Sequence, residues 1–113
     1  MGEEKRYETR VVKWLESKGC YVRKYFANRN TKRGVPDLIC VVNGYPVFIE
    51  VKASTGKPSE LQYYNQRKIR KAGGISIILY PDQFEEFKTF MEELLRMCPD
   101  PMSEGQYDFD KKK

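Results

Sequence analysis

The amino-acid sequence predicts one α/β domain in which a mixed β-sheet is flanked by helices, with an extra C-terminal helix. Two apolar runs, 37–42 and 45–52, are separated by Asn43-Gly44, the strongest short signal for a β-hairpin. A third apolar run, 75–80, follows a predicted helix, so a right-handed crossover should place it parallel to a neighbouring strand. The expected order is helix, three antiparallel strands, crossover helix, strand and helix, with the sheet covered on both faces.

The first expected element is a helix over residues 3–18. Its apolar residues fall on one arc at about 100° per residue, which is typical of an amphipathic helix. These residues are Tyr7, Val11, Val12, Trp14 and Leu15. Glu8 falls inside the same arc, and a carboxylate on a buried face needs a partner. Gly19 is suited to end this helix.

The other elements follow from strand, turn and capping signals. Residues 20–26 are rich in aromatic and β-branched types and are expected to form the first strand. Ser59 is a suitable N-cap for a helix over residues 60–72, which two glycines end. Asp82 is expected to cap a last helix with a phenylalanine-rich apolar face.

A two-residue loop fixes the register of the hairpin. With residues 43–44 in the loop, Asp37 lies opposite Glu50, at a pair whose Cα atoms are about 4.5 Å apart. Pro46 falls at a position without a ladder hydrogen bond, where its missing N–H costs nothing. Lys52 is two residues past Glu50 and therefore lies on the same face.

Two opposed carboxylates destabilise a strand pair, so this arrangement makes sense if a cation lies between them. The first helix has to cover one sheet face, and Glu8 is the residue that it can point inward. Three carboxylates and Lys52 would then converge. The alternative is an ordinary sheet in which Asp37 lies at a turn and Glu50 pairs with Lys52 on a solvated strand. That alternative leaves Glu8 unexplained.

Composition narrows the chemistry. The chain has no histidine, which removes the commonest general base and favours oxygen ligands and a hard cation such as Mg²⁺ or Mn²⁺. The three cysteines lack metal-binding spacing and are expected to be reduced and buried; they are Cys20, Cys40 and Cys98. Nothing in the sequence points to an organic cofactor.

Length and hydropathy indicate a single domain over residues 1–98, followed by a polar tail over 99–113 that we expect to be mobile and dispensable for chemistry. No apolar stretch approaches the ~20 residues of a membrane span, and no secretory signal is visible. The expected location is therefore the cytoplasm, or that of the host cell if the protein is viral.

Positive charge is concentrated in the first part of the chain. Residues 1–81 contain sixteen Lys/Arg against seven Asp/Glu, whereas residues 82–113 contain five against nine. A one-sided positive field suits a phosphate backbone, although simple solvation explains any single basic residue equally well. The candidates for DNA contact are Arg23, Lys24, Arg29, Lys32, Arg33, Lys57 and Arg67.

These motifs resemble the PD-(D/E)XK nuclease superfamily, and most closely its virus-type replication-repair nuclease domain, VRR-NUC. The pattern is a glutamate in the first helix, then GxPD, ExK and S-x-x-Q. The matching segments are Glu8, 34–37 (GVPD), 50–52 (EVK) and 59–62 (SELQ). The resemblance covers about residues 4–80 and implies a restriction-endonuclease-like αβββαβ core.

The resemblance also implies a metal centre. Glu8, Asp37, Glu50 and the Val51 carbonyl are expected to ligate one or two Mg²⁺ or Mn²⁺ ions. Such ions would polarise the scissile phosphate and lower the pKa of an attacking water.

The catalytic residues implied by the resemblance are Asp37, Glu50, Lys52 and Gln62. Lys52 is expected to orient or help deprotonate the water, or to stabilise charge on the phosphate. Gln62 is expected to position Lys52, the water or the phosphate from the neighbouring helix; the alternative reading is an exposed helix glutamine. Gly34 is expected to give the DNA backbone close access.

Stand-alone members of this family resemble viral and phage proteins and are similar in size and fold to Holliday-junction resolvases. The resemblance therefore implies a homodimer that cuts branched DNA, because a two-fold dimer matches the symmetry of a four-way junction. Other readings remain: a nuclease for flaps, ends or plain duplex, a restriction-type enzyme, a ribonuclease, or a non-catalytic DNA-binding subunit.

Overall fold

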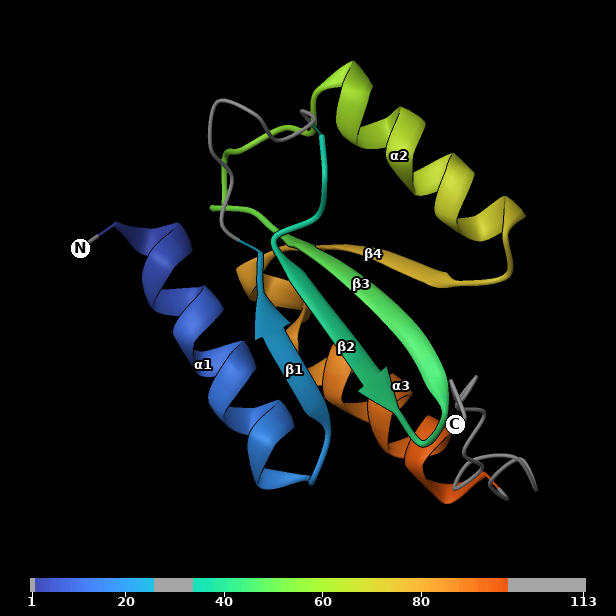
Figure 1. Ribbon diagram of the computed structural model, residues 1–113. Coiled ribbons are helices and arrows are strands. Elements are labelled where there is room, and N and C mark those ends of the chain that lie inside the picture. Colours follow the sequence, from blue (N-terminus) through green and yellow to red (C-terminus); the bar gives the residue numbers. More distant parts are fainter. Residues whose placement is uncertain (1, 26–33, 98–113) are drawn as a thin grey trace, which may run out of the picture.

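The computed structural model describes residues 2–25 and 34–97. Its elements, shown in Figure 1, are α1 (Glu3–Ser17), β1 (Tyr21–Lys24), β2 (Leu38–Val42), β3 (Tyr45–Val51), α2 (Glu60–Lys71), β4 (Ile75–Leu79), the short 3₁₀ helix η1 (Pro81–Gln83) and α3 (Phe84–Arg96). The predicted order of helices and strands is confirmed. The segment 26–33 of the basic loop and the predicted tail 99–113 lie outside the described residues.

The sheet has the strand order β1-β2-β3-β4. Strands β2 and β3 pair antiparallel with Leu38 opposite Ile49, which confirms the register expected from the hairpin. Asn43 (φ 49°) and Gly44 (φ 86°) both adopt the left-handed conformation that a two-residue hairpin turn favours. Strand β4 runs parallel to β3, as the crossover through α2 requires.

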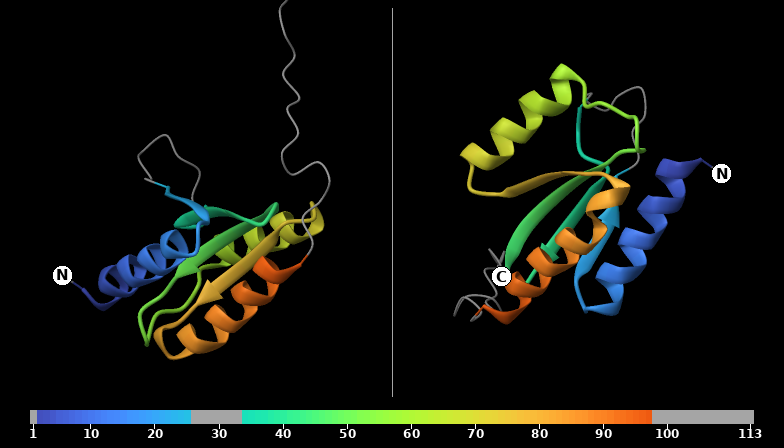
Figure 2. Two further views of the ribbon diagram at one scale, coloured as in Figure 1. Left: turned by 90° about the horizontal axis from the view of Figure 1, so that it is seen from below. Right: turned by 180° about the vertical axis from the view of Figure 1, so that it is seen from behind.

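Helices α1 and α3 cover one face of the sheet, and the hydrophobic core lies between them and the strands (Figure 2). The fully buried side chains include Val11, Leu15, Leu38, Cys40, Val42, Val47, Ile49, Val51, Leu79 and Met91. Burial contributes roughly 1.5–3 kcal/mol for each large apolar side chain. This core therefore fixes the two strands that end at Asp37 and Glu50.

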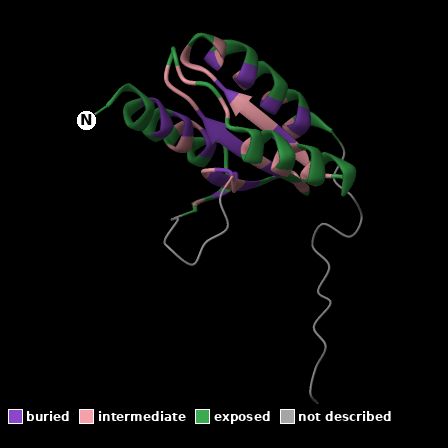
Figure 3. Ribbon diagram, turned by 90° about the horizontal axis from the view of Figure 1, so that it is seen from above, coloured by how far each residue is buried: buried purple, intermediate pink, exposed green. Residues whose placement is uncertain are grey.

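The opposite face of the sheet is only partly covered. Helix α2 lies over β3 and β4, where Gln62 contacts Glu50 and Arg70 contacts Ser76. None of its twelve residues is buried (Figure 3). Within residues 2–25 and 34–97, no helix lies over the same face of β1 and β2, where Tyr21 and Val41 are exposed. The prediction of a sheet flanked by helices is confirmed, whereas coverage of this face over β1 and β2 stays a prediction.

Side-chain hydrogen bonds cap the first turns of α2 and of η1, the 3₁₀ turn that leads into α3. The Ser59 hydroxyl accepts a hydrogen bond from the Gln62 backbone N–H at 3.1 Å, and the Gln62 Oε1 accepts one from the Ser59 N–H at 2.9 Å. This capping box confirms Ser59 as the N-cap. The prediction for Asp82 is wrong, because the chain turns first through η1 and the Gln83 side chain accepts from the Tyr80 N–H.

Gly34 is required by packing within the chain. Its φ is +80°, and an added Cβ would lie 2.7 Å from the Leu61 carbonyl carbon and 2.8 Å from the Asn65 Nδ2. A side chain would therefore push α2 away from the segment that leads into β2. This close approach to α2 explains the glycine without DNA.

Two smaller expectations concern the cysteines and the membrane. Cys20 and Cys40 are free and buried, as predicted, whereas Cys98 lies outside the described residues. Within residues 2–25 and 34–97, no helix has the length and apolar character needed to cross a membrane.

Candidate active site

Asp37 and Glu50 lie together at one end of the central hairpin, as the register predicts. Asp37 directly precedes β2, and Glu50 is the next-to-last residue of β3. The Val51 backbone N–H donates a hydrogen bond to Asp37 Oδ2 at 3.0 Å, which holds that carboxylate against the strand. Glu50 is 7% exposed, so the pair lies at the edge of a largely dry layer.

Lys52 and Gln62 complete the cluster from two different elements. The Lys52 ammonium lies 3.6 Å from Glu50 Oε2, and its side chain is largely buried. The Gln62 Nε2 donates to the same oxygen at 2.7 Å. The four residues that the resemblance marks as catalytic are therefore brought together, and the solvated-strand alternative does not fit their burial.

The second oxygen of Glu50 is unusual. Oε1 is buried and accepts no hydrogen bond from any described residue. A buried carboxylate oxygen without a donor is costly, since its desolvation is not compensated. This oxygen is open to a proton or a cation.

The environment raises the pKa values of both carboxyls. Burial raises the pKa of Glu50 to about 8, and the neighbouring Asp37 carboxylate adds to the shift while Lys52 opposes it. Burial also raises the pKa of Asp37, against the lowering effect of the Val51 N–H. Two close carboxylates at a dry edge therefore hold a proton more readily than usual, and shifts of this kind are typical of functional sites.

Glu8 of α1 lies near Asp37 and Glu50 but forms an ion pair with Lys24. It is buried on the face of α1 where its position in the apolar arc predicted, and its Oε1 lies 2.8 Å from the ammonium of Lys24 on β1. The Glu8 charge nevertheless helps to raise the pKa of Asp37, so the two carboxylates are near each other. Lys24, a candidate for DNA contact, is the partner that a buried Glu8 required.

Glu4 is a further acidic residue at the site that sequence reasoning missed. Burial raises its pKa first, and the charge of Asp37 raises it further. In turn, the Glu4 charge contributes to the raised pKa of Glu50. Glu4 and Glu8 are four residues apart on α1 and so share a helix face, which was the signal that could have identified Glu4.

The segment after Lys52 is held in place by two contacts from outside it. The Ser54 backbone N–H donates to Glu3 Oε1 at 3.0 Å, and the Ser54 hydroxyl donates to Glu3 Oε2. The Tyr80 hydroxyl donates to the Gly56 carbonyl at 2.8 Å. Helix α1 and the residue that follows β4 therefore fix the loop after Lys52.

The donor set is suited to a hard divalent cation, although the predicted ligands are not assembled as one shell. Within residues 2–25 and 34–97, no group of three or more carboxylates and thiols is arranged to hold a metal ion. Asp37 and Glu50 supply carboxylate oxygens, one of them without a hydrogen bond, which is what Mg²⁺ or Mn²⁺ prefers. Glu8 is near but is paired with Lys24.

The remaining candidates for DNA contact differ in where the structure places them. Arg29, Lys32 and Arg33 lie outside the described residues. Lys57 and Arg67 are exposed, on the loop before α2 and on α2 itself. The Arg23 guanidinium lies 4.4 Å from the centre of the Tyr21 ring, on the face of β1 that no described helix covers.

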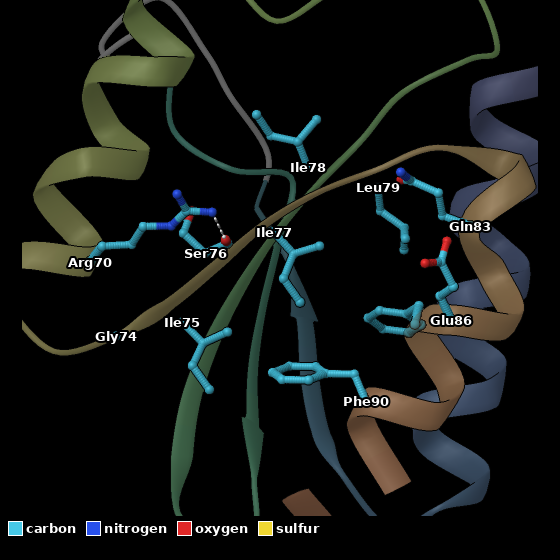
Figure 4. Close-up of a pocket in the computed structure, with 11 residues that line it drawn as sticks. Arg70, Gly74, Ile75, Ser76, Ile77, Ile78, Leu79, Gln83, Glu86 and Phe90 are labelled. Atoms are coloured by element: carbon cyan, nitrogen blue, oxygen red, sulfur yellow. Dashed lines mark hydrogen bonds between the residues drawn. The ribbon is translucent and has the colours of Figure 1, made fainter. Parts of the chain in front are cut away.

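A separate groove of about 540 Å³ follows the outer edge of β4, between α2 and α3 (Figure 4). Ile75, Ile77 and Phe90 give it an apolar lining, and the Arg70 guanidinium donates to the Ser76 carbonyl at 2.9 Å. None of the catalytic candidates lines it. Arg70 protects a carbonyl of an edge strand, which is a structural role.

The family comparison agrees with the site. A family model described as archaeal Holliday junction resolvase (Hjc) matches residues 2–97. No curated protein and no solved structure gives a significant match. The match supports the resemblance to the PD-(D/E)XK superfamily, whereas the narrower resemblance to VRR-NUC remains a prediction.

Proposed function

Because this chain belongs to the archaeal Holliday junction resolvase family, a family of structure-specific endonucleases, we propose that it cuts branched DNA with the help of Mg²⁺ or Mn²⁺. The observation that carries this proposal is the cluster of Asp37, Glu50, Lys52 and Gln62. The Lys52 ammonium and the Gln62 amide both contact Glu50 Oε2, and the Asp37 carboxylate, held by the Val51 N–H, interacts with Glu50 from the neighbouring strand end.

The metal would be held by Asp37 and Glu50, with the Val51 carbonyl and Glu8 as further ligands. The free Oε1 of Glu50 supports this assignment, because a cation would give that oxygen the partner it lacks. When bound, a divalent ion polarises the scissile phosphate and lowers the pKa of the attacking water.

The protein side chains position the reacting groups. The Val51 N–H fixes Asp37, and Gln62 fixes one oxygen of Glu50, so both carboxylates are preorganised. The Lys52 ammonium lies 3.6 Å from Glu50 Oε2, so it is placed to stabilise negative charge that develops on the phosphate.

We also propose that the active form is a homodimer. The face of β1 and β2 that no described helix covers supports this, because Tyr21 and Val41 are paired neighbours there and are 55% and 45% exposed. Neighbouring apolar side chains that are exposed in this way are typical of a contact surface. Val41→Glu is expected to give monomers in sedimentation velocity without loss of fold.

The finer assignment of the chain to the VRR-NUC type of nuclease is also part of the proposed function.

The direct test is cleavage of labelled four-way junction, flap, single-stranded and plain duplex DNA. Each substrate is incubated with Mg²⁺ or Mn²⁺, with EDTA, and with the Lys52→Ala variant. Lys13→Ala, which removes an exposed lysine of α1, is the matched control. We expect paired, symmetric cuts in the junction that EDTA and Lys52→Ala abolish and Lys13→Ala preserves.

The other outcomes separate the competing functions. Cutting of flaps or plain duplex in preference to the junction would keep the nuclease and remove the junction assignment. Dependence on a 2′-hydroxyl would indicate a ribonuclease. Binding to junctions without cutting under either metal would contradict the enzymatic proposal and favour a DNA-binding subunit.

A further inference from the structure

The contact between Lys24 and Glu8 places a cation of the protein itself beside the carboxylate cluster. Lys24 Nζ lies 2.8 Å from Glu8 Oε1. The Glu8 side chain is 11% exposed and that of Lys24 is 33% exposed, so the pair lies at the border between the interior and solvent. An ion pair in this position is screened less than one on the surface.

The position of Lys24 is fixed by the sheet. Lys24 is the last residue of β1 and pairs with Leu38, the residue after Asp37. The next backbone N–H, that of Tyr25, donates to the Asp37 carbonyl at 2.7 Å. The backbone that carries Lys24 is therefore anchored to the backbone that carries Asp37.

The electrostatics connect the pair to the active site. The charge of Asp37 acts on Lys24, and the charge of Glu8 acts on Asp37. Lys24 therefore neutralises part of the negative charge that would otherwise attract a divalent cation. Among the described residues, the expected ligand shell is incomplete, and the ion pair with Lys24 explains why Glu8 does not contribute to it.

We propose that Lys24 is an exchangeable counter-ion that couples metal binding to DNA binding. Without metal, the ammonium group holds Glu8. If Glu8 were to ligate a divalent ion, Lys24 would lose this partner, and its ammonium group would be available to a DNA phosphate. This inference rests on the proposed function and makes Lys24 a positioning residue that acts through Glu8.

The coupling is reciprocal. If metal releases Lys24 for DNA, then DNA that engages Lys24 must tighten metal binding by the same factor. A phosphate is a suitable alternative partner, because an ammonium group binds it as a point charge. The structure therefore predicts cooperative loading of metal and DNA.

The test measures metal affinity without catalysis. Titration calorimetry with Mn²⁺ at pH 8 compares the wild-type protein with Lys24→Met, which removes the charge, and Lys24→Gln, which keeps a donor for Glu8. Lys13→Gln is the matched control, since it removes the same charge from the exposed side of α1. Circular dichroism verifies the fold of each variant.

Both Lys24 variants are expected to bind Mn²⁺ about tenfold more tightly than the wild type, because metal binding no longer has to break the ion pair with Glu8, and tenfold is the scale of one such pair at the border with solvent. Lys13→Gln should leave the affinity unchanged. Equal or weaker binding by Lys24→Gln would overturn the proposal, because that variant keeps Glu8 hydrogen-bonded.

A second measurement tests the coupling. Ca²⁺ affinity is measured with and without a four-way junction, using Ca²⁺ as the probe of metal binding. Junction DNA should tighten Ca²⁺ binding to the wild type and have a clearly smaller effect on Lys24→Gln. Equal coupling in both proteins would overturn the role of Lys24 while leaving the cleavage assay, and so the proposed function, unaffected.

Discussion

Glu50 is the residue whose ionisation should control the stability of the metal-free protein. Its pKa rises from an ordinary 4.5 to about 8 in the folded state, chiefly through burial. The folded state therefore retains a proton that the unfolded chain loses between these values. The stabilisation from this group is complete below pH 4.5 and is lost as the pH rises through about 8.

We therefore expect the free energy of unfolding in EDTA to fall from pH 5 to pH 8, and we expect Glu50→Gln to flatten this dependence. Urea unfolding at four pH values in this range measures it. A slope in Glu50→Gln as steep as in the wild type would show that another group causes the pH dependence.

Mg²⁺ should stabilise the wild type more at pH 8 than at pH 6, because the metal competes with the Glu50 proton.

The grouping of the candidate catalytic residues was predictable because sheet geometry is periodic. A two-residue turn and an alternation of side chains suffice to place Asp37 opposite Glu50 with Lys52 on the same face. Helical spacing placed Glu8 on the inner face of α1 and could have placed Glu4 beside it, but the ion pair between Glu8 and Lys24 was not predictable in the same way. It depends on how α1 lies against β1 and on how far a flexible lysine reaches, and local spacing fixes neither.

Among the elements, α2 has both a structural and a chemical role through Gln62. One end of this side-chain amide accepts from the Ser59 N–H, and the other donates to Glu50. The helix cap and the active site therefore share one side chain. A substitution in the helix cap should therefore alter the position of Gln62 at the candidate active site.

Ser59→Ala is expected to lower the free energy of unfolding by about 1 kcal/mol, the usual cost of losing an N-cap. It should also reduce the cleavage rate severalfold, because Gln62 loses half of the box that orients it. Thr89→Ala, which removes an exposed hydroxyl bonded to a backbone carbonyl in α3, is the control and should leave cleavage unchanged. Loss of stability in Ser59→Ala with unchanged cleavage would show that Gln62 is positioned by Glu50 alone.

The element order was predictable from apolar periodicity and turn residues, whereas the coverage of the sheet was not. A pattern of apolar residues shows that a strand face is apolar, but not what covers it. Helix α2 has few apolar residues, and none of its residues is buried. It covers two of the four strands. The start of α3 was misjudged because Pro81 favours a tight first turn, which moved the beginning of the α-helix past Asp82.

At the scale of the whole molecule, the two ends of the sheet differ in what they offer to DNA. The candidate catalytic cluster lies at the end of the sheet where β3 finishes, with the exposed Lys57 on the loop that follows. The opposite end holds the hairpin turn, which Asn43 ties to the last turn of α3 by donating to the Leu94 carbonyl at 2.9 Å. A duplex bound for cleavage should therefore contact the first end and not the second.

This orientation can be tested with two single charge removals. Lys57→Gln removes a positive charge at the catalytic end, and Arg96→Gln removes one at the end of α3, beside the hairpin turn. The logarithm of DNA affinity falls linearly with the logarithm of salt concentration, by about 0.9 for each phosphate neutralised. We expect Lys57→Gln to reduce this slope by about one phosphate contact and Arg96→Gln to leave it unchanged, in junction-binding titrations with Ca²⁺ at several salt concentrations. The reverse result would place the duplex at the hairpin end, far from Asp37 and Glu50, and would contradict the catalytic assignment of that cluster.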